Sequence, residues 1–157
     1  MFKSFKFTAM LFSIAMFSAN SFAEEIGSVD TAFKIIGANH KIVMEVFDDP
    51  LVKGVSCYIS RAKAGGISGS LGLAQDKSDA SVACRQIGPI DFTAALPVQA
   101  EVFSQSASIL FKKIRVVRVV DSKRQTLVYM IYSDKLIDGS PQNSITAVAV
   151  GKPIPVK

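Results

Sequence analysis

The stretch that decides the fold is SILFKKIRVVRVVDSKRQTLVYMIYSD, residues 108–134. Two runs rich in valine, isoleucine, leucine and tyrosine flank the polar segment DSKRQ, and these residue types favour extended strands. The pattern predicts a long antiparallel hairpin that turns at DSKRQ. Both parities of LVYMIY, residues 127–132, are apolar, so we expect this strand to be covered on both faces and central in its sheet.

Alternating apolar and polar residues mark further strands before this hairpin. The segments TAFKII, residues 31–36, and KIVMEVF, residues 41–47, are predicted to form a first hairpin through the turn-forming GANH. In VSCYIS, residues 55–60, the same alternation turns Cys57 toward the core. We therefore expect Cys57 to point inward from a half-buried strand.

The segment SDASVACRQIGP, residues 78–89, has the pattern of a short helix instead. Ser78 can cap its start, and Gly88 followed by Pro89 supplies a stop. Four of its residues recur with the spacing of one helix face: Ala80, Ala83, Cys84 and Ile87. The pattern therefore predicts a helix here, with Cys84 facing the core.

Two other regions stay open. VQAEVF, residues 98–103, is the best strand candidate within residues 91–107, and SITAVAV, residues 144–150, fits either a strand or a short helix. Taken together, the patterns predict an α+β fold: a single domain of mainly antiparallel β-sheet with one or more short helices.

Cys57 and Cys84 are the only two cysteines, and both are expected to point inward. In an exported chain, two cysteines form a structural disulfide more often than a metal or redox site. Closing a loop of about 28 residues contributes roughly 3.5 kcal/mol in the chain-entropy account. A redox enzyme would favour C-x-x-C near a helix start, whereas these cysteines are 27 positions apart. We therefore predict one structural disulfide.

Between the cysteines lies GGISGSLGL, a segment with four glycines. It contains neither G-x-x-x-x-G-K-[ST] nor a G-x-G-x-x-G between strand and helix, the loops that bind nucleotide phosphates. A mobile or tightly turning surface loop is the main interpretation. Anion binding by backbone amides and contact with a partner are the alternatives. The possible partner-contact loop comprises Gly65, Gly66, Ile67, Ser68, Gly69, Ser70, Leu71, Gly72 and Leu73.

The N-terminal sequence MFKSFKFTAMLFSIAMFSANSFAEE has the three parts of a secretory signal peptide. Two lysines precede a short apolar run, and Ser-Phe-Ala supplies the small-residue cleavage pattern. The run is shorter than the roughly 20 residues that span a bilayer, so we predict cleavage after Ala23 rather than an anchor. Residues 1–23 are then the signal peptide and residues 24–157 form a periplasmic domain without a transmembrane segment.

The mature chain is of ordinary domain size and carries little net charge. Removal of 23 of the 157 residues leaves 134, enough for one domain with a core. Loss of Lys3 and Lys6 lowers the formal net charge from +5 to +3. A charge this small does not indicate nucleic acid or another polyanion as a partner.

His40 is the only histidine, and strand parity places it with Ile42, Met44 and Val46 on the apolar side of its strand. One histidine cannot assemble a multi-histidine metal site. The main interpretation is a hydrogen-bonded histidine in the core or at its rim. A role in pH-dependent binding and a role as general base are the alternatives.

The remaining charged groups predict no catalytic, cofactor or metal site. Glu45, Asp48 and Asp49 precede Pro50, and a turn whose carboxylates cap backbone amides is favoured over a cation site. The basic residues of the hairpin divide between strand faces, so we expect solvated charges rather than a nucleic-acid stripe. Weak contact with anionic glycans, lipid headgroups or an acidic partner is the alternative. The set is Lys112, Lys113, Arg115, Arg118, Lys123 and Arg124.

Four segments together resemble one known family. EEIGSVDTAFKIIG, HKIVMEVFDDPLVKGVSCYISRAKAGGI, LGLAQDKSDASVACRQIGPI and YSDKLIDGSPQNSI are similar to the bacterial CreA family, also called catabolite regulation protein A. The resemblance covers nearly the whole mature chain and is weakest from about residue 91 to residue 107. It implies a small exported protein of Gram-negative bacteria and brings no catalytic or ligand-binding residues with it. The family name suggests gene control, but an exported chain cannot contact the chromosome.

Two functions follow as expectations. The first is a non-catalytic binding or accessory protein of the periplasm, whose partner is an envelope protein or a small ligand. The second is a small hydrolase or isomerase acting on an envelope metabolite. The enzyme would need a pocket that gathers His40 or an acidic pair with a nucleophile.

Overall fold

All the regular secondary structure in the described part of the chain is β-strand. The computed structural model describes residues 23–32, 39–63, 80–106, 113–134 and 142–157. Within these ranges there is no helix, and therefore none that could cross a membrane. The strands are β1 (Glu24–Ala32), β2 (His40–Asp48), β3 (Val52–Lys63), β4 (Ala80–Phe92), β5 (Gln99–Ser106), β6 (Lys113–Asp121), β7 (Thr126–Ser133) and β8 (Asn143–Ala149).

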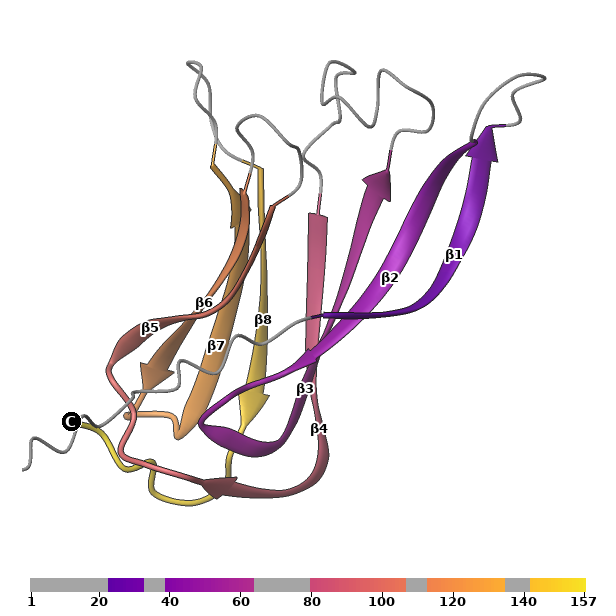
Figure 1. Ribbon diagram of the computed structural model, residues 1–157. Coiled ribbons are helices and arrows are strands. Elements are labelled where there is room, and N and C mark those ends of the chain that lie inside the picture. The colour runs from indigo at the N-terminus through magenta and orange to yellow at the C-terminus, as the bar shows by residue number, and fades with distance from the viewer. Residues whose placement is uncertain (1–22, 33–38, 64–79, 107–112, 135–141) are drawn as a thin grey trace, which may run out of the picture.

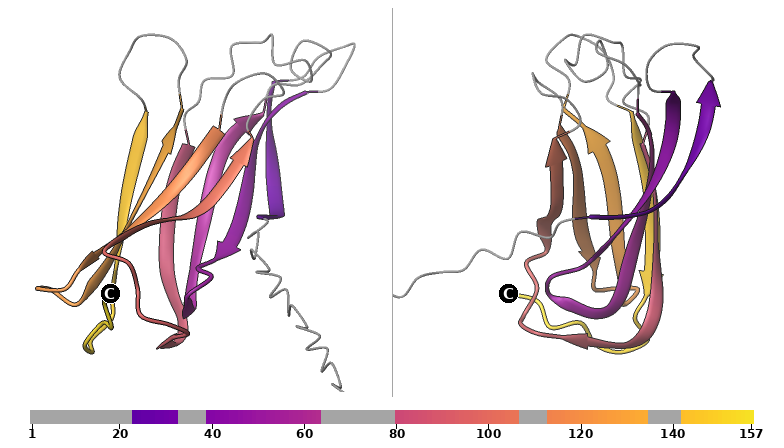
Figure 2. Two further views of the ribbon diagram at one scale, coloured as in Figure 1. Left: turned by 60° about the vertical axis from the view of Figure 1, so that its left-hand side comes forward. Right: turned by 45° about the vertical axis from the view of Figure 1, so that its right-hand side comes forward.

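The strands form two four-stranded antiparallel sheets. The first sheet has the order β1-β2-β3-β4 and the second the order β5-β6-β7-β8, so neighbours in sequence are neighbours in space. The sheets face each other, with β4 close to β8 and β7 (Figures 1 and 2). β1, β3, β5 and β7 end at one end of the sandwich, which we call the loop end, and the tight β2–β3 and β6–β7 turns lie at the opposite end (Figure 1).

The predicted helix at residues 78–89 is wrong, and the α+β class falls with it. Ala80–Phe92 is strand β4, in which Val82 and Cys84 alternate inward and are buried. Ile87, expected on the buried helix face, is 60% exposed. Four apolar residues at helical spacing also fit a strand of period two, and pairing with β3 outweighs the local helical pattern. The fold is an all-β sandwich.

The hairpin predicted within residues 108–134 is confirmed over the described residues 113–134. β6 and β7 pair along their whole lengths, and β7 lies between β6 and β8. On the inner face of β7, Leu127, Tyr129 and Ile131 are fully buried, whereas Met130 on the outer face is partly exposed. The central position is therefore confirmed, but the outer face of this strand is less well covered than expected.

One predicted strand lies at a different place in the sequence, and the two regions left open are now assigned. β1 lies earlier than the predicted strand at residues 31–36, although it does pair with β2 as a hairpin. Most of that predicted strand and the start of its turn lie outside the described residues. The two open regions are both strands, β5 and β8.

The core fills the space between the sheets. Its members come from both sheets, and the rings of Phe47 and Phe103 stack across the interface with centroids 4.5 Å apart. Such stacking contributes beyond the apolar area that it buries. The C-terminal segment adds Ile154 to this core, and Val156 bridges to Leu96.

A glycine permits the close approach of β3 and β4. Gly54 has a φ of 77° and lies where the β3–β4 register shifts. A Cβ atom at this position would lie 2.4 Å from the carbonyl oxygen of Pro89, so no side chain fits without moving the backbone.

Gly54→Ala is therefore expected to destabilise the fold strongly. The left-handed backbone alone costs a non-glycine residue about 1–3 kcal/mol, and the clash with Pro89 adds to this. Gly151→Ala is the matched control, because Gly151 has a φ of 69° but no atom within 4 Å of the added Cβ. Urea denaturation should show the larger loss for Gly54→Ala, and equal losses would contradict the proposed clash.

Candidate functional site

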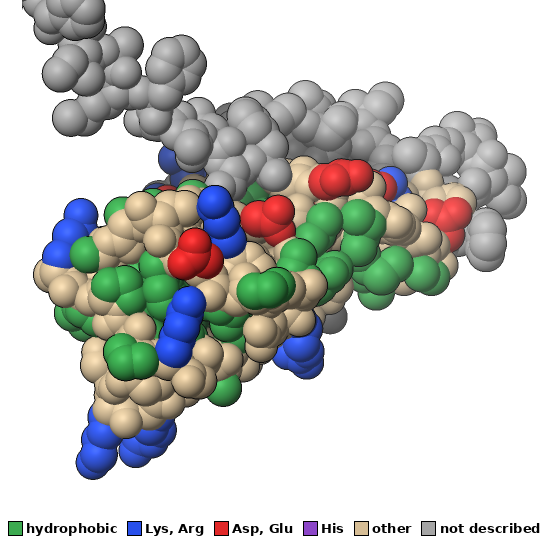
Figure 3. Space-filling model, turned by 90° about the horizontal axis from the view of Figure 1, so that it is seen from below, with side chains coloured by type: hydrophobic (Ala, Val, Ile, Leu, Met, Phe, Trp, Pro, Cys, Tyr) green, Lys and Arg blue, Asp and Glu red, His purple; other side chains and the backbone are tan. Residues whose placement is uncertain are grey.

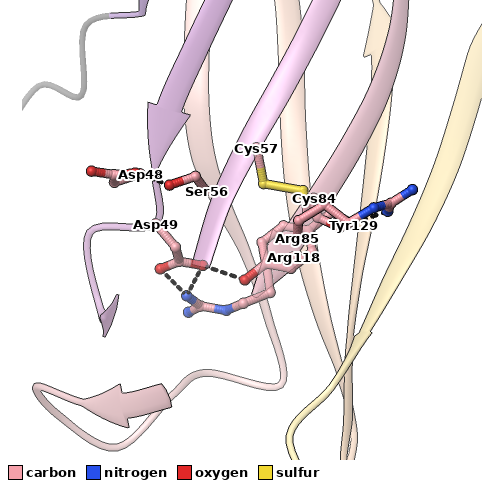
Figure 4. Close-up of a disulfide and its surroundings, with 8 residues drawn as sticks. All are labelled: Asp48, Asp49, Ser56, Cys57, Cys84, Arg85, Arg118 and Tyr129. Atoms are coloured by element: carbon pink, nitrogen blue, oxygen red, sulfur yellow. Dashed lines mark hydrogen bonds and ion pairs between the residues drawn. A yellow bond between two sulfur atoms is a disulfide. The ribbon is translucent and has the colours of Figure 1, made fainter. Parts of the chain in front are cut away.

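The two cysteines form the predicted disulfide. Cys57 on β3 and Cys84 on β4 are register partners, and their sulfur atoms are 2.01 Å apart (Figure 4). Both residues are fully buried on the inner face of the first sheet. Cys84 points inward as expected, but from a strand rather than a helix. The bond joins β3 to β4, the last strand of the first sheet, whose outer face is described below.

A buried ion pair joins the β2–β3 turn to the second sheet. The side chains of Asp49 and Arg118 are fully buried, and Nη1 of Arg118 donates to both Asp49 oxygens at 2.6 and 2.7 Å. The hydroxyl of Tyr129 donates to Asp49 Oδ2 at 2.9 Å (Figure 4). The amide of Leu51 donates to Oδ1, which confirms that Asp49 caps backbone in this turn. We call these three side chains the clamp.

The clamp is structural. Burial, and next the negative charge of Asp49, raise the pKa of Tyr129 far above its ordinary value, so Tyr129 stays a hydrogen-bond donor. Nε and Nη2 of Arg118 are buried without a hydrogen-bond partner among the described residues, which leaves Asp49 as the group that compensates this charge. The prediction that the basic residues of the hairpin are solvated is therefore wrong for Arg118. Its strand parity, shared with Val116 and Val120, was the available signal.

Asp49→Ala should destabilise the protein by about 3–5 kcal/mol, because it leaves Arg118 buried and uncompensated. Replacing both partners, as Asp49→Leu with Arg118→Met, should recover most of that loss, because no charge then remains in the core. Urea denaturation of the wild type and the two variants measures both effects. A loss below about 1 kcal/mol for Asp49→Ala would mean that the clamp does not hold the sheets together.

A second polar cluster lies between the sheets toward the loop end. Glu45 accepts hydrogen bonds from Nε and Nη2 of Arg61, each at 2.8 Å, and both residues are buried. Gln105 of the second sheet also donates to Glu45, and Lys63 approaches it at 3.9 Å. Burial acts to raise the pKa of Glu45, but the hydrogen bonds and charge of Arg61 outweigh it, and the pKa lies below its ordinary value.

The lowered pKa of Glu45 predicts acid sensitivity. A carboxylate with a depressed folded-state pKa stabilises the fold above its unfolded pKa, about 4.3, and loses this contribution as the pH falls further. The stability difference between wild type and Glu45→Gln should therefore be largest near neutral pH and shrink below about pH 4. Thermal melts from pH 3 to pH 7 measure it, with Glu101→Gln as an exposed control. A difference that does not change with pH would contradict this assignment.

His40 lies on the opposite face of β2 from Glu45. It begins β2 and shares strand parity with Ile42 and Met44, as expected, but this parity forms the outer face of the sheet and not the core. Glu45 and Asp49 point into the interior. Among the described residues no group of three or more histidine, cysteine or acidic side chains is placed to hold a metal ion.

The described basic side chains of the hairpin other than Arg118 lie at the surface, as the sequence predicted, and they do so in different places. Arg115 pairs with Glu101 and Asp134 across the outer face of the second sheet. Arg124 pairs with Asp121 in the β6–β7 turn. Lys112 lies outside the described residues. The arrangement does not concentrate these charges on one side.

The surface feature that stands out is the outer face of the first sheet. Several of its apolar side chains are exposed, and apolar side chains form a band on the side where β1 and β2 lie, with acidic groups along one border (Figure 3). Register pairs place Val29 beside Ile42 and Val46 beside Tyr58. Clustered exposed apolar side chains of this kind mark interaction sites. The face comprises Val29, Ile42, Met44, Val46, Tyr58, Ser60, Ala62, Ser81 and Ala83.

A shallow hollow of about 400 Å³ opens at the loop end of this face. Ser60 and Ser81 hydrogen-bond each other there at 2.8 Å, and Arg61 is already held by Glu45. The hollow lies where β3 ends and β4 begins, the two strands that the glycine-rich segment connects. That segment, residues 65–73, lies outside the described residues. The lining is Ile42, Ser60, Arg61, Ala62, Ala80, Ser81 and Gln142.

Comparison with known proteins gives one consistent result. A family model described as CreA protein matches residues 26–152. The curated proteins named Protein CreA from Escherichia coli strains K12, CFT073 and O157:H7 are each 52% identical over 150 residues, which cover 93% of this chain and 96% of each relative. No solved structure matches.

Proposed function

Because this chain belongs to the CreA family, with 52% identity to the Escherichia coli proteins, we propose that it acts in the periplasm as a non-catalytic binding or accessory protein. The observation that carries this proposal is where the reactive side chains lie. Glu45 and Asp49 are inside the sandwich in ion pairs, and His40 is on the opposite side of β2. A general acid or base needs access to a substrate, and burial in ion pairs denies that access to Glu45 and Asp49, while His40 lies on the other face of β2 from Glu45.

Two features support export. A buried disulfide of this kind forms and persists in oxidising compartments such as the periplasm. The first strand begins at Glu24, directly after the predicted cleavage site, so removal of residues 1–23 retains all eight strands of the described chain.

The loop end is the proposed contact surface. The connections between β1 and β2, β3 and β4, β5 and β6, and β7 and β8 all leave from it. Loops on a rigid scaffold often carry binding function, and the disulfide and the clamp make the scaffold rigid. The hollow supplies polar and apolar groups beside the strand ends that flank residues 64–79. We propose that residues 65–73 contact an envelope protein or a small ligand there.

Photoreactive residues placed at Ser68 and Ser70 are expected to crosslink a partner in living cells. Probes at Lys123 and Arg124 are the controls, because the β6–β7 turn lies at the opposite end of the sandwich. Crosslinked species that appear with the loop probes and not with the controls would support the proposal. No capture, or the same species from both sets, would refute the contact surface.

The same cells test export. Mature protein released from the periplasm should begin at Glu24 when its N-terminus is sequenced. Recovery of the full-length chain in the cytoplasmic fraction would refute the periplasmic location while leaving the crosslinking result valid.

A further inference from the structure

We infer that a second copy of this chain docks on the outer face of the first sheet, related by a two-fold axis that runs along β3. The inference goes beyond the proposed function, which concerns the loop end. The outer face exposes apolar side chains that no described part of the chain covers. The positions of its charged side chains match those of a second copy turned onto it.

The middle of this face carries no charge. The ladders of β2, β3 and β4 align its residues in rows that cross the three strands. The two uncharged rows are Met44, Ser60 and Ser81, and Val46, Tyr58 and Ala83. The third row, nearer the tight turns, holds Asp48 on β2, Ser56 on β3 and Arg85 on β4.

Asp48 and Arg85 are placed symmetrically about β3. Neighbouring strands are about 4.8 Å apart, so each residue lies about one strand spacing from β3, on opposite sides of it. A two-fold rotation about an axis along β3 lays β2 of one copy over β4 of the other. Asp48 then faces Arg85 of the second copy, twice, and Tyr58 meets Tyr58 of the second copy at the axis. Strands of the two facing sheets stay aligned, as in ordinary sheet packing.

Asp48 and Arg85 each make a hydrogen bond within one copy. Asp48 accepts a hydrogen bond from the Ser56 hydroxyl, and Arg85 donates to the carbonyl of its neighbour Cys84. Neither residue takes part in an ion pair among the described residues. Figure 4 shows Asp48 and Arg85 extending to opposite sides of the strand that carries Cys57. The next charges along this ladder, Lys53 and Asp91, are register partners beyond the Gly54 bulge.

Other surfaces fit a second copy less well. The free edge of β1 is interrupted by two register shifts and carries Glu24, Glu25 and Asp30, features that oppose edge-to-edge pairing. The outer face of the second sheet is crossed by the ion pairs of Arg115. With the axis along β3, only β2, β3 and β4 overlap between the two copies. A flat face of three strands and six residues measures about 300 Å² from standard spacings, so the dimer belongs to the weak, concentration-dependent class.

Sedimentation velocity over a series of micromolar concentrations tests the inference on the purified mature chain. The wild type should dimerise as its concentration rises. Tyr58→Glu puts two carboxylates at the axis and should raise the dissociation constant at least tenfold. Ile145→Glu is the matched control, because Ile145 is 67% exposed on the outer face of the second sheet, and it should leave the dissociation constant unchanged. Met44→Glu replaces Tyr58→Glu if the latter does not fold by circular dichroism.

A charge swap tests the geometry. Arg85→Glu should weaken the dimer by placing two acids together, and adding Asp48→Lys should restore it. A wild type that stays monomeric at every concentration, equal effects of Tyr58→Glu and Ile145→Glu, or a swap that restores nothing would each overturn the inference. A monomer that still crosslinks a partner through Ser68 or Ser70 would mean that this inference has failed while the proposed function stands.

Discussion

The fold depends on the charge of Arg118 being neutralised inside the sandwich by Asp49. A guanidinium in the middle of an apolar core is costly unless an acid compensates it, and the acid here comes from the other sheet. The β2–β3 turn must therefore stay against the second sheet, where Tyr129 also binds it. From this turn β3 runs in register with β2 and β4, which brings Cys57 opposite Cys84. The disulfide then joins β3 to β4 in the sheet that the clamp holds against the second sheet.

Much of the fold could be predicted from the sequence where the local pattern of apolar residues agreed with the strand pairing in the folded protein. The β6–β7 hairpin followed from two runs rich in strand-forming residues around a polar turn, and the inward Cys57 followed from the alternation in residues 55–60. The helix at residues 78–89 was wrong because four apolar residues at helical spacing also contain the alternating pair Val82 and Cys84, and only β3 decides between them. The clamp was missed for a different reason: parity shows that Arg118 shares a face with valines, but its partner lies 69 residues away.

The same limit applied to the candidate site. Parity correctly grouped His40 with Ile42 and Met44, yet it could not say which face of the strand meets the second sheet. The inner face holds Glu45 instead, with Arg61 as its partner, so one charged pair lies among the apolar core residues of this sheet while apolar side chains are exposed on its outside. An antiparallel sheet with one solvated face usually exposes polar side chains there. The exposed apolar side chains of this outer face are the basis of the inferred contact between two copies.

Native-state hydrogen exchange tests the central claim, that the clamp makes the two sheets one cooperative unit, most directly. The amide of Val52 bonds to the carbonyl of Asp49 in the β2–β3 turn, and the amides of Tyr129 and Ile131 lie in the central strand of the second sheet. Our account predicts that all three exchange only through global unfolding, with the same free energy and the same denaturant dependence. Exchange of Val52 through a local opening of much lower free energy, while β7 stays protected, would contradict it.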